Sequence, residues 1–146
     1  MKRNMTLLFF LTLLSGCSIS TTVKPVQQQI SKLCIKSNPS VFMEGFLPEI
    51  KKQIEQKEIP TEVVDKYQKD NCPKMLEYTA NWRWDIVMYL YYAELKVYED
   101  NQLLGLAVYD AKWGGARLDK FGTTSGKVEP LINELFKNQI KHSTNQ

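Results

Sequence analysis

The stretch that decides the fold is LEYTANWR, residues 76–83. Every second side chain from Leu76 to Trp82 is apolar, and the residues between them are polar. Side chains on a β-strand point alternately to its two faces, so this pattern places all the apolar groups on one face. The stretch therefore predicts a strand that turns one side toward a core and the other side away from it.

Two further strands follow along the chain. Residues 89–98 and 103–109 have strand-like composition, and the polar segment 99–102 between them is typical of a turn. Together they predict an antiparallel hairpin. A glycine inside a strand often marks a close neighbour, so Gly105 predicts that an aromatic ring packs over it. After the Gly114-Gly115 break, residues 117–121 are expected to add an edge strand.

The segment before residue 76 predicts a strand, a helix and a short strand. Residues 30–36 are expected to form the first strand, and residues 61–64 the short one. Between them, Phe46, Ile50 and Ile54 recur at helical spacing. Proline is tolerated in the first turn of a helix, so Pro48 places the helix start near residues 44–45, with the end near residue 57.

The last predicted element is a second helix. Its apolar residues recur from Val128 to Phe136 at spacings of three and four. Pro130 indicates a first turn and places the cap near Ser125. The order of elements predicts an α+β fold: a two-layer sandwich, with a mainly antiparallel sheet of three to five strands and both helices packed on one face.

The N-terminus has the features of an export signal. Lys2 and Arg3 precede an apolar stretch over residues 5–14, which is half of the roughly 20 residues needed to span a bilayer. Leu14-Ser15-Gly16-Cys17 follows and resembles the lipobox of bacterial lipoproteins. That resemblance implies a signal peptide over residues 1–16, cleavage after Gly16, and lipid on the Cys17 thiol and amine. The alternative is a plain signal peptide that happens to contain a cysteine.

The remaining chain divides into a tether, a body and a tail. Residues 17–29 combine the lipidated Cys17 with a polar, hydroxyl-rich segment that is typical of a flexible linker. We expect residues 30–140 to form a single periplasmic α+β domain and residues 141–146 a polar tail. In lipoproteins an Asp after the lipidated cysteine favours the inner membrane, so Ser18 at that position implies the outer membrane.

Cys34 and Cys72 are the two cysteines that lipidation leaves over. An even pair in an oxidising compartment predicts a disulfide bond, which would restrict the unfolded chain by about 4 kcal/mol. The alternative for Cys34 is a buried core thiol. A metal site is a weaker alternative to the disulfide, because the single histidine, His142, lies in the tail and the cysteines are not closely spaced.

Composition and motifs exclude several functions. The chain has 146 residues, and removal of residues 1–16 leaves 17 basic and 16 acidic side chains without a basic run, which does not favour nucleic-acid binding. Neither a base paired with a nucleophile nor a phosphate-binding loop is found. Asp85 and Asp110 are the carboxylates best placed for a hydrolase, but turn support explains them better. We expect neither an enzyme nor a cofactor.

Aromatic side chains gather in the predicted sheet. Neighbouring residues of a strand point to opposite faces, so some of these rings must lie on the open side. The candidate binding face comprises Trp82, Trp84, Tyr89, Tyr91 and Tyr92. Exposed tyrosine and tryptophan anchor protein partners or stack on sugar rings. The alternative is cross-strand packing that stiffens the sheet.

A family resemblance covers nearly all of the mature chain. It is carried by Leu76-Glu77-Tyr78-Thr79-Ala80, Trp84-Asp85, Tyr89-Leu90, Ala93-Glu94-Leu95, Gly105 with Ala107 and Tyr109, Gly114-Gly115, Lys120-Phe121 and the two cysteines Cys34 and Cys72. With these residues the chain resembles the Sbal-type group of small bacterial lipoproteins, which implies no particular activity. At fold level it also looks like the amino-terminal domain of the Tol system's propeller protein and auxiliary lipoproteins of lipid transporters.

These features together predict a membrane-anchored periplasmic lipoprotein without catalytic activity. We expect it to act as an interaction module that docks a protein partner of the cell envelope. The alternative is a carrier or binder of a cell-wall or lipid ligand, held on the aromatic face of the sheet.

Overall fold

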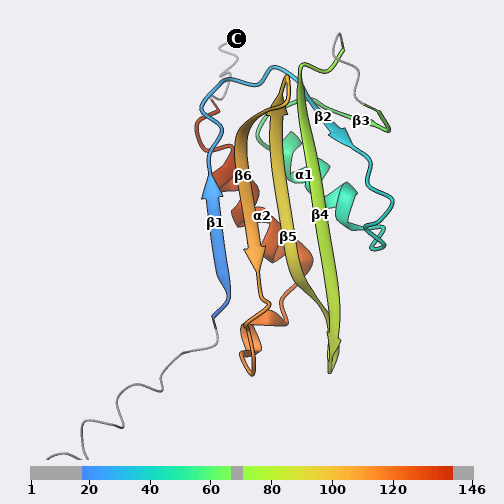
Figure 1. Cartoon of the computed structure of the whole chain (residues 1–146), viewed down its shortest axis with the longest axis vertical. Helices are drawn as coiled ribbons and strands as arrows, with labels where there is room; N and C mark the ends of the chain where they lie inside the picture. The colour runs from blue at the N-terminus through green and yellow to red at the C-terminus, as the bar shows by residue number, and fades with distance from the viewer. Residues whose placement is uncertain (1–17, 67–70, 140–146) are drawn as a thin grey trace, which may run out of the picture.

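The computed structural model describes residues 18–66 and 71–139. Within these residues the fold is α+β: one mixed sheet of six strands, in the order β1-β6-β5-β4-β2-β3, and two α-helices. Figure 1 shows both helices behind the sheet. The elements are β1 Ser20–Lys24, β2 Leu33–Lys36, α1 Phe46–Glu55, β3 Thr61–Val64, β4 Lys74–Asp85, β5 Val87–Glu99, β6 Gln102–Asp110, a 3₁₀ turn η1 Leu118–Lys120, and α2 Thr124–Leu135.

The first strand, β1, corrects the prediction of a flexible tether over residues 17–29. Residues Ser20–Lys24 pair antiparallel with β6, from Ser20 opposite Asp110 to Lys24 opposite Leu106. The strand lies at the edge of the sheet with mostly exposed side chains, so it needs no apolar periodicity. Its β-branched Thr and Val residues favour extended backbone. With this strand the sheet has six strands, more than the three to five expected. β3 was predicted with the bounds that the structure shows.

The three longest strands form the predicted antiparallel meander. β4 pairs with β5, and β5 pairs with β6. Asp100 and Asn101 join β5 to β6 with φ of 47° and 67°, so both central residues of this two-residue turn lie in the left-handed region that tight hairpins require. A register shift between Asn81 and Trp82 marks a bulge in the β4–β5 pair.

The other two strands run parallel to β4. β2 pairs with β4 and with β3, both in parallel, and α1 lies between β2 and β3 in the chain. The α1 helix begins after its N-cap Gly45 and has Pro48 in its first turn, as predicted. Two expectations were wrong: residues 117–121 contain the 3₁₀ turn and not an edge strand, and Pro130 lies inside α2, which is capped by Thr123.

The core lies between the helices and the sheet. Phe46 and Ile50 of α1, with Leu131 and Leu135 of α2, belong to one buried cluster that includes side chains of β2, β4, β5 and β6. Gly105 of β6 is also packed closely, but not by an aromatic ring. A methyl group on it would come within 2.5 Å of Val26 Cγ2 and 3.0 Å of Leu135 Cδ1. Aliphatic side chains therefore occupy the space above this glycine.

Candidate interaction surfaces

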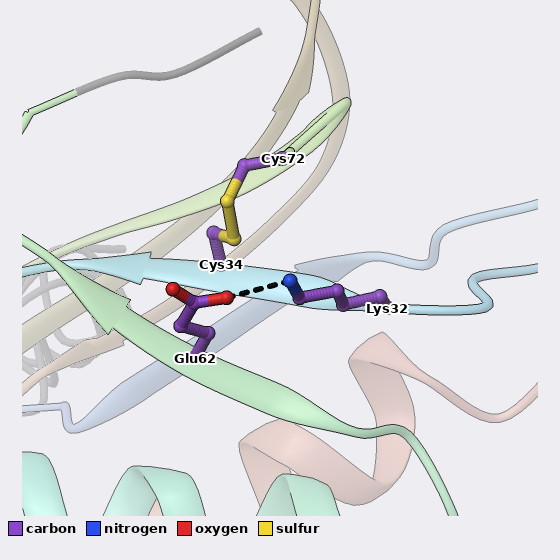
Figure 2. The surroundings of a disulfide bond; sticks show 4 residues. All are labelled: Lys32, Cys34, Glu62 and Cys72. Carbon is purple, nitrogen blue, oxygen red and sulfur yellow. Dashed lines mark ion pairs between the residues drawn. A yellow bond between two sulfur atoms is a disulfide. The ribbon is translucent and has the colours of Figure 1, made fainter. Parts of the chain in front are cut away.

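The predicted disulfide bond joins Cys34 to Cys72, as Figure 2 shows. Cys34 lies on β2, Cys72 precedes β4, and their Cα atoms are 5.6 Å apart. Both residues are buried in a small cluster with Met75, and Val64 packs against it. The bond thus fastens β2 to the start of β4, where these two strands share only a short ladder.

Cys34, Cys72 and Glu62 form a group of potential metal-binding atoms within 4.8 Å of one another. The two sulfurs are bonded to each other, so neither is a free thiolate, the form in which cysteine binds metals. The Glu62 carboxylate lies 2.6 Å from Lys32 Nζ, and Figure 2 shows this ion pair beside the disulfide. The group is therefore a structural crosslink with an adjacent salt bridge.

The five aromatic residues of the predicted binding face do not share one surface. Trp82 packs against the core, with its ring centroid 5.2 Å from that of Phe46 on α1. Tyr89 is 6% exposed and meets the ring of Phe121 edge-on at 5.6 Å. Trp84 is 69% exposed near the end of β4. The structure thus separates Trp82 and Tyr89 from the open side of the sheet.

Tyr91 and Tyr92 are partly covered by cations from neighbouring segments. The Arg83 guanidinium lies 4.3 Å from the Tyr91 ring centroid, and Lys112 Nζ lies 4.2 Å from that of Tyr92. The Tyr92 hydroxyl donates a hydrogen bond to Glu94 at 3.2 Å. Burial, with the nearby Glu94 carboxylate, raises the pKa of Tyr92. These contacts hold both rings in place and cover part of their faces, so they reduce the area open to a stacked ligand.

Asp85 and Asp110, the carboxylates weighed for hydrolysis, each have a structural partner. Asp85 accepts a hydrogen bond from Lys120 Nζ at 2.6 Å, and the same ammonium donates to the Gly115 carbonyl at 2.6 Å. Lys120 is only 5% exposed and also lies near the rings of Tyr89 and Phe121. Asp110 accepts from the backbone amide of Lys112 at 2.8 Å, which is the turn-supporting role.

A second polar cluster connects α2 to the sheet. Lys127 Nζ donates to the Tyr109 hydroxyl at 2.7 Å and to the Asp119 carbonyl at 3.0 Å. Burial raises the pKa of Tyr109 to about 12 and lowers the pKa of Lys127. Tyr109 therefore stays neutral at physiological pH. The two hydrogen bonds of Lys127 anchor the loop between β6 and α2.

Sequence reasoning missed a concentration of exposed apolar side chains at one end of the molecule. Ile86 is 75% exposed, Trp113 77% and Leu118 78%. Val87 and Met88 beside Ile86 are exposed as well. The signal was present in the run Ile86-Val87-Met88 directly after Asp85, which is apolar where a hairpin turn is ordinarily polar.

Cys17, the predicted lipidation site, lies outside the described residues. In the part of the chain that the structure covers, no helix has the length and apolar character needed to cross a bilayer.

Comparison with solved structures shows a shared fold. No protein-family profile matches the chain, and no curated protein is similar to it. Two solved structures of PelC from Paraburkholderia phytofirmans, both described as dodecamers, have the same fold. One, of the L103M variant, has a TM-score of 0.55 at 9% identity and covers 81% of this chain and 94% of its own. The other has a TM-score of 0.53 at 10% identity and covers 84% and 98%.

Proposed function

We propose that this chain is a non-catalytic interaction module, anchored through a lipid on Cys17 at the periplasmic side of the outer membrane. The lipobox-like segment Leu14-Ser15-Gly16-Cys17 supports the anchor. The Cys34–Cys72 disulfide supports an oxidising compartment outside the cytoplasm, since such bonds are rare where thiols are kept reduced. In this proposal the body is a two-layer sandwich whose helices cover one face of the sheet.

The partner that the observations favour is another copy of the same chain. The observation that carries this is the shared fold: PelC, whose solved structures are dodecamers, matches over more than four fifths of this chain. In addition, β1 and β3 are the outer strands of the sheet, and within residues 18–66 and 71–139 each has one side without a partner strand. Such an edge offers unpaired amide and carbonyl groups to another strand.

The directions of the two edge strands suit a head-to-tail assembly. The chain direction reverses three times from β1 to β4 and does not change from β4 through β2 to β3. The β1 strand of one copy would therefore lie antiparallel to the β3 strand of the next when both copies have the same orientation. Head-to-tail contacts form a ring when the rotation between successive copies closes, and a filament when it does not. We propose the ring. All Cys17 anchors would then point to the same side of the ring, as attachment to one membrane requires.

The alternative of a ligand carrier has less support. It needs a platform of exposed rings, whereas Trp82 and Tyr89 are packed against Phe46 and Phe121. Tyr91 and Tyr92 are partly buried, and each ring has a cation within 4.3 Å of its centroid. A sugar or lipid would have to displace these cations before it stacked.

We expect Val63→Lys to weaken self-association of the mature lipoprotein by about tenfold or more, equivalent to ~1.4 kcal/mol. Val63 is 40% exposed on the edge strand β3, and lysine on an edge strand opposes pairing with another sheet. The oligomeric state is measured in mild detergent by light scattering during size-exclusion chromatography.

The matched control is Thr79→Lys, because Thr79 is exposed on β4, inside the sheet, and not at an edge. This variant should assemble as the wild type does. A wild-type protein that stays monomeric at all concentrations would contradict the proposed partner, and equal effects of the two substitutions would contradict the proposed edge.

A further inference from the structure

One end of the body carries both the start of the chain and the exposed apolar side chains. In Figure 1 the start of β1, the turn between β4 and β5, and the loop after β6 all lie at the lower end of the molecule. Ile19, just before β1, lies against Gly114 in that loop, where a methyl group on Gly114 would be 3.4 Å from Ile19 Cγ1. The first described residues are therefore in contact with this end.

The distance from this end to the lipid is short. Cys17 stands two residues before Ile19, and an extended chain spans at most ~3.6 Å per residue, so the two Cα atoms are within about 7 Å. The pairing of β1 with β6 removes the length that a flexible tether would have supplied. If acyl chains on Cys17 are in a bilayer, the end that bears Ile19 and Gly114 lies at the bilayer surface.

The side chains exposed at this end suit that location. Trp84 is 69% exposed and Ile86 75%, and both belong to the β4–β5 hairpin. Trp113 and Leu118, on the loop after β6, are exposed to a similar degree. Tryptophan prefers the boundary between lipid and water, because its ring is apolar and its indole N–H is polar.

The two segments that carry these side chains are joined firmly. Lys120, in the loop after β6, is buried and bonds both Asp85 of the hairpin and Gly115 of its own loop. Ile86 forms the tip of the hairpin with a φ of 63°. A β-branched residue is strained in this region, where Gly or Asn would fit easily. An exposed apolar residue that also strains its backbone points to a role outside folding.

From this arrangement we infer that Trp84, Ile86, Trp113 and Leu118 insert into the interface of the bilayer that holds the Cys17 lipid. This inference rests on the proposed lipid anchor and adds a second contact to it. The body then lies on the membrane in a fixed orientation. In this orientation β1 and β5 run away from the membrane surface, and β4 and β6 run toward it. Rotation about the tether is thereby restricted.

The test uses tryptophan fluorescence of the mature lipidated protein. The protein is reconstituted into phosphatidylethanolamine–phosphatidylglycerol vesicles with ordinary or brominated acyl chains, because bromine quenches indole only on contact. We expect brominated vesicles to quench wild-type emission. Trp84→Phe and Trp113→Phe should each lose part of this quenching. The variant with both substitutions retains only Trp82, which packs on Phe46, and should show none.

Flotation of the vesicles separates failure of the inference from failure of the anchor. Protein that floats with the vesicles but is not quenched by bromine would overturn the membrane contact and leave the anchor in place. Protein that does not float would overturn both. Protection of Trp84 and Trp113 from acrylamide without quenching by bromine would show that a second copy covers this end, and would also overturn the membrane contact.

Discussion

Mature protein with alanine at both Cys34 and Cys72 should lose about 4 kcal/mol of unfolding free energy. The disulfide closes a loop with a sequence separation of 38 residues, and opening that loop frees the unfolded chain. A small domain has roughly 5–15 kcal/mol in total, so this loss is a large share. Chemical denaturation followed by circular dichroism measures it. Reducing agent should lower the midpoint of the wild type to that of the variant and should leave the variant unchanged.

The loss of stability in this variant should be greatest at the flank of the sheet that β2 and β3 form. β2 is registered with β4 at only two positions, Cys34 with Met75 and Ile35 with Leu76, and β3 is attached to the sheet through β2. Amide hydrogen exchange should therefore increase most in β2 and β3 when the crosslink is removed. A variant with an unchanged unfolding midpoint would show that the disulfide has no stabilising role.

Gly105→Ala should lower the free energy of unfolding by about 1–3 kcal/mol, the usual cost of overpacking a core. The added methyl group would meet Val26 Cγ2 at 2.5 Å, Leu135 Cδ1 at 3.0 Å and the Lys24 carbonyl oxygen at 3.2 Å. Val26 and Leu135 are fully buried, and Lys24 O belongs to the backbone, so none of the three has free space to move into. Thermal and chemical denaturation measure the loss.

Two further variants test the cause of this loss. Gly45→Ala is the matched control, because no atom lies within 4 Å of a methyl group at that position, and its cost should stay below ~1 kcal/mol. Val26→Ala removes the closest methyl group. The cost of Gly105→Ala should therefore be smaller in a Val26→Ala background, as a double-mutant cycle would show. Equal costs at Gly105 and Gly45 would contradict this packing.

The sequence predicted the elements that bury one regular face. β4, β5, β6 and α1 have clear apolar periodicity, and their bounds agree with the predictions to within a few residues. β1 could not be found in this way, because an edge strand with exposed side chains has the composition of a linker. Pro130 was misleading for a similar reason: the packing of α2 on the core tolerates a proline that would end an isolated helix.

The candidate site was harder to predict, because strand alternation fixes a face but not what covers it. The bulge at Asn81/Trp82 changes the register, so that Leu90 lies opposite Trp82 and both contact the core. Tyr89 is covered by Phe121, on a loop whose position depends on the buried Lys120. Neither a bulge nor a loop contact leaves a periodic signal. For the exposed end, the sequence contained a signal in the apolar run Ile86-Val87-Met88, but the predictions from the sequence did not use it.

The proposed anchor and the membrane contact both require that Cys17 becomes the lipidated first residue of the mature protein. Intact-mass and tandem mass spectrometry of protein extracted from the membrane fraction tests it most directly. We predict a mature chain that begins at Cys17, with a diacylglyceryl group in thioether linkage and an acyl group on its amine. A mature chain that begins at any other residue, or that carries an unmodified Cys17 thiol, would rule out the lipid anchor.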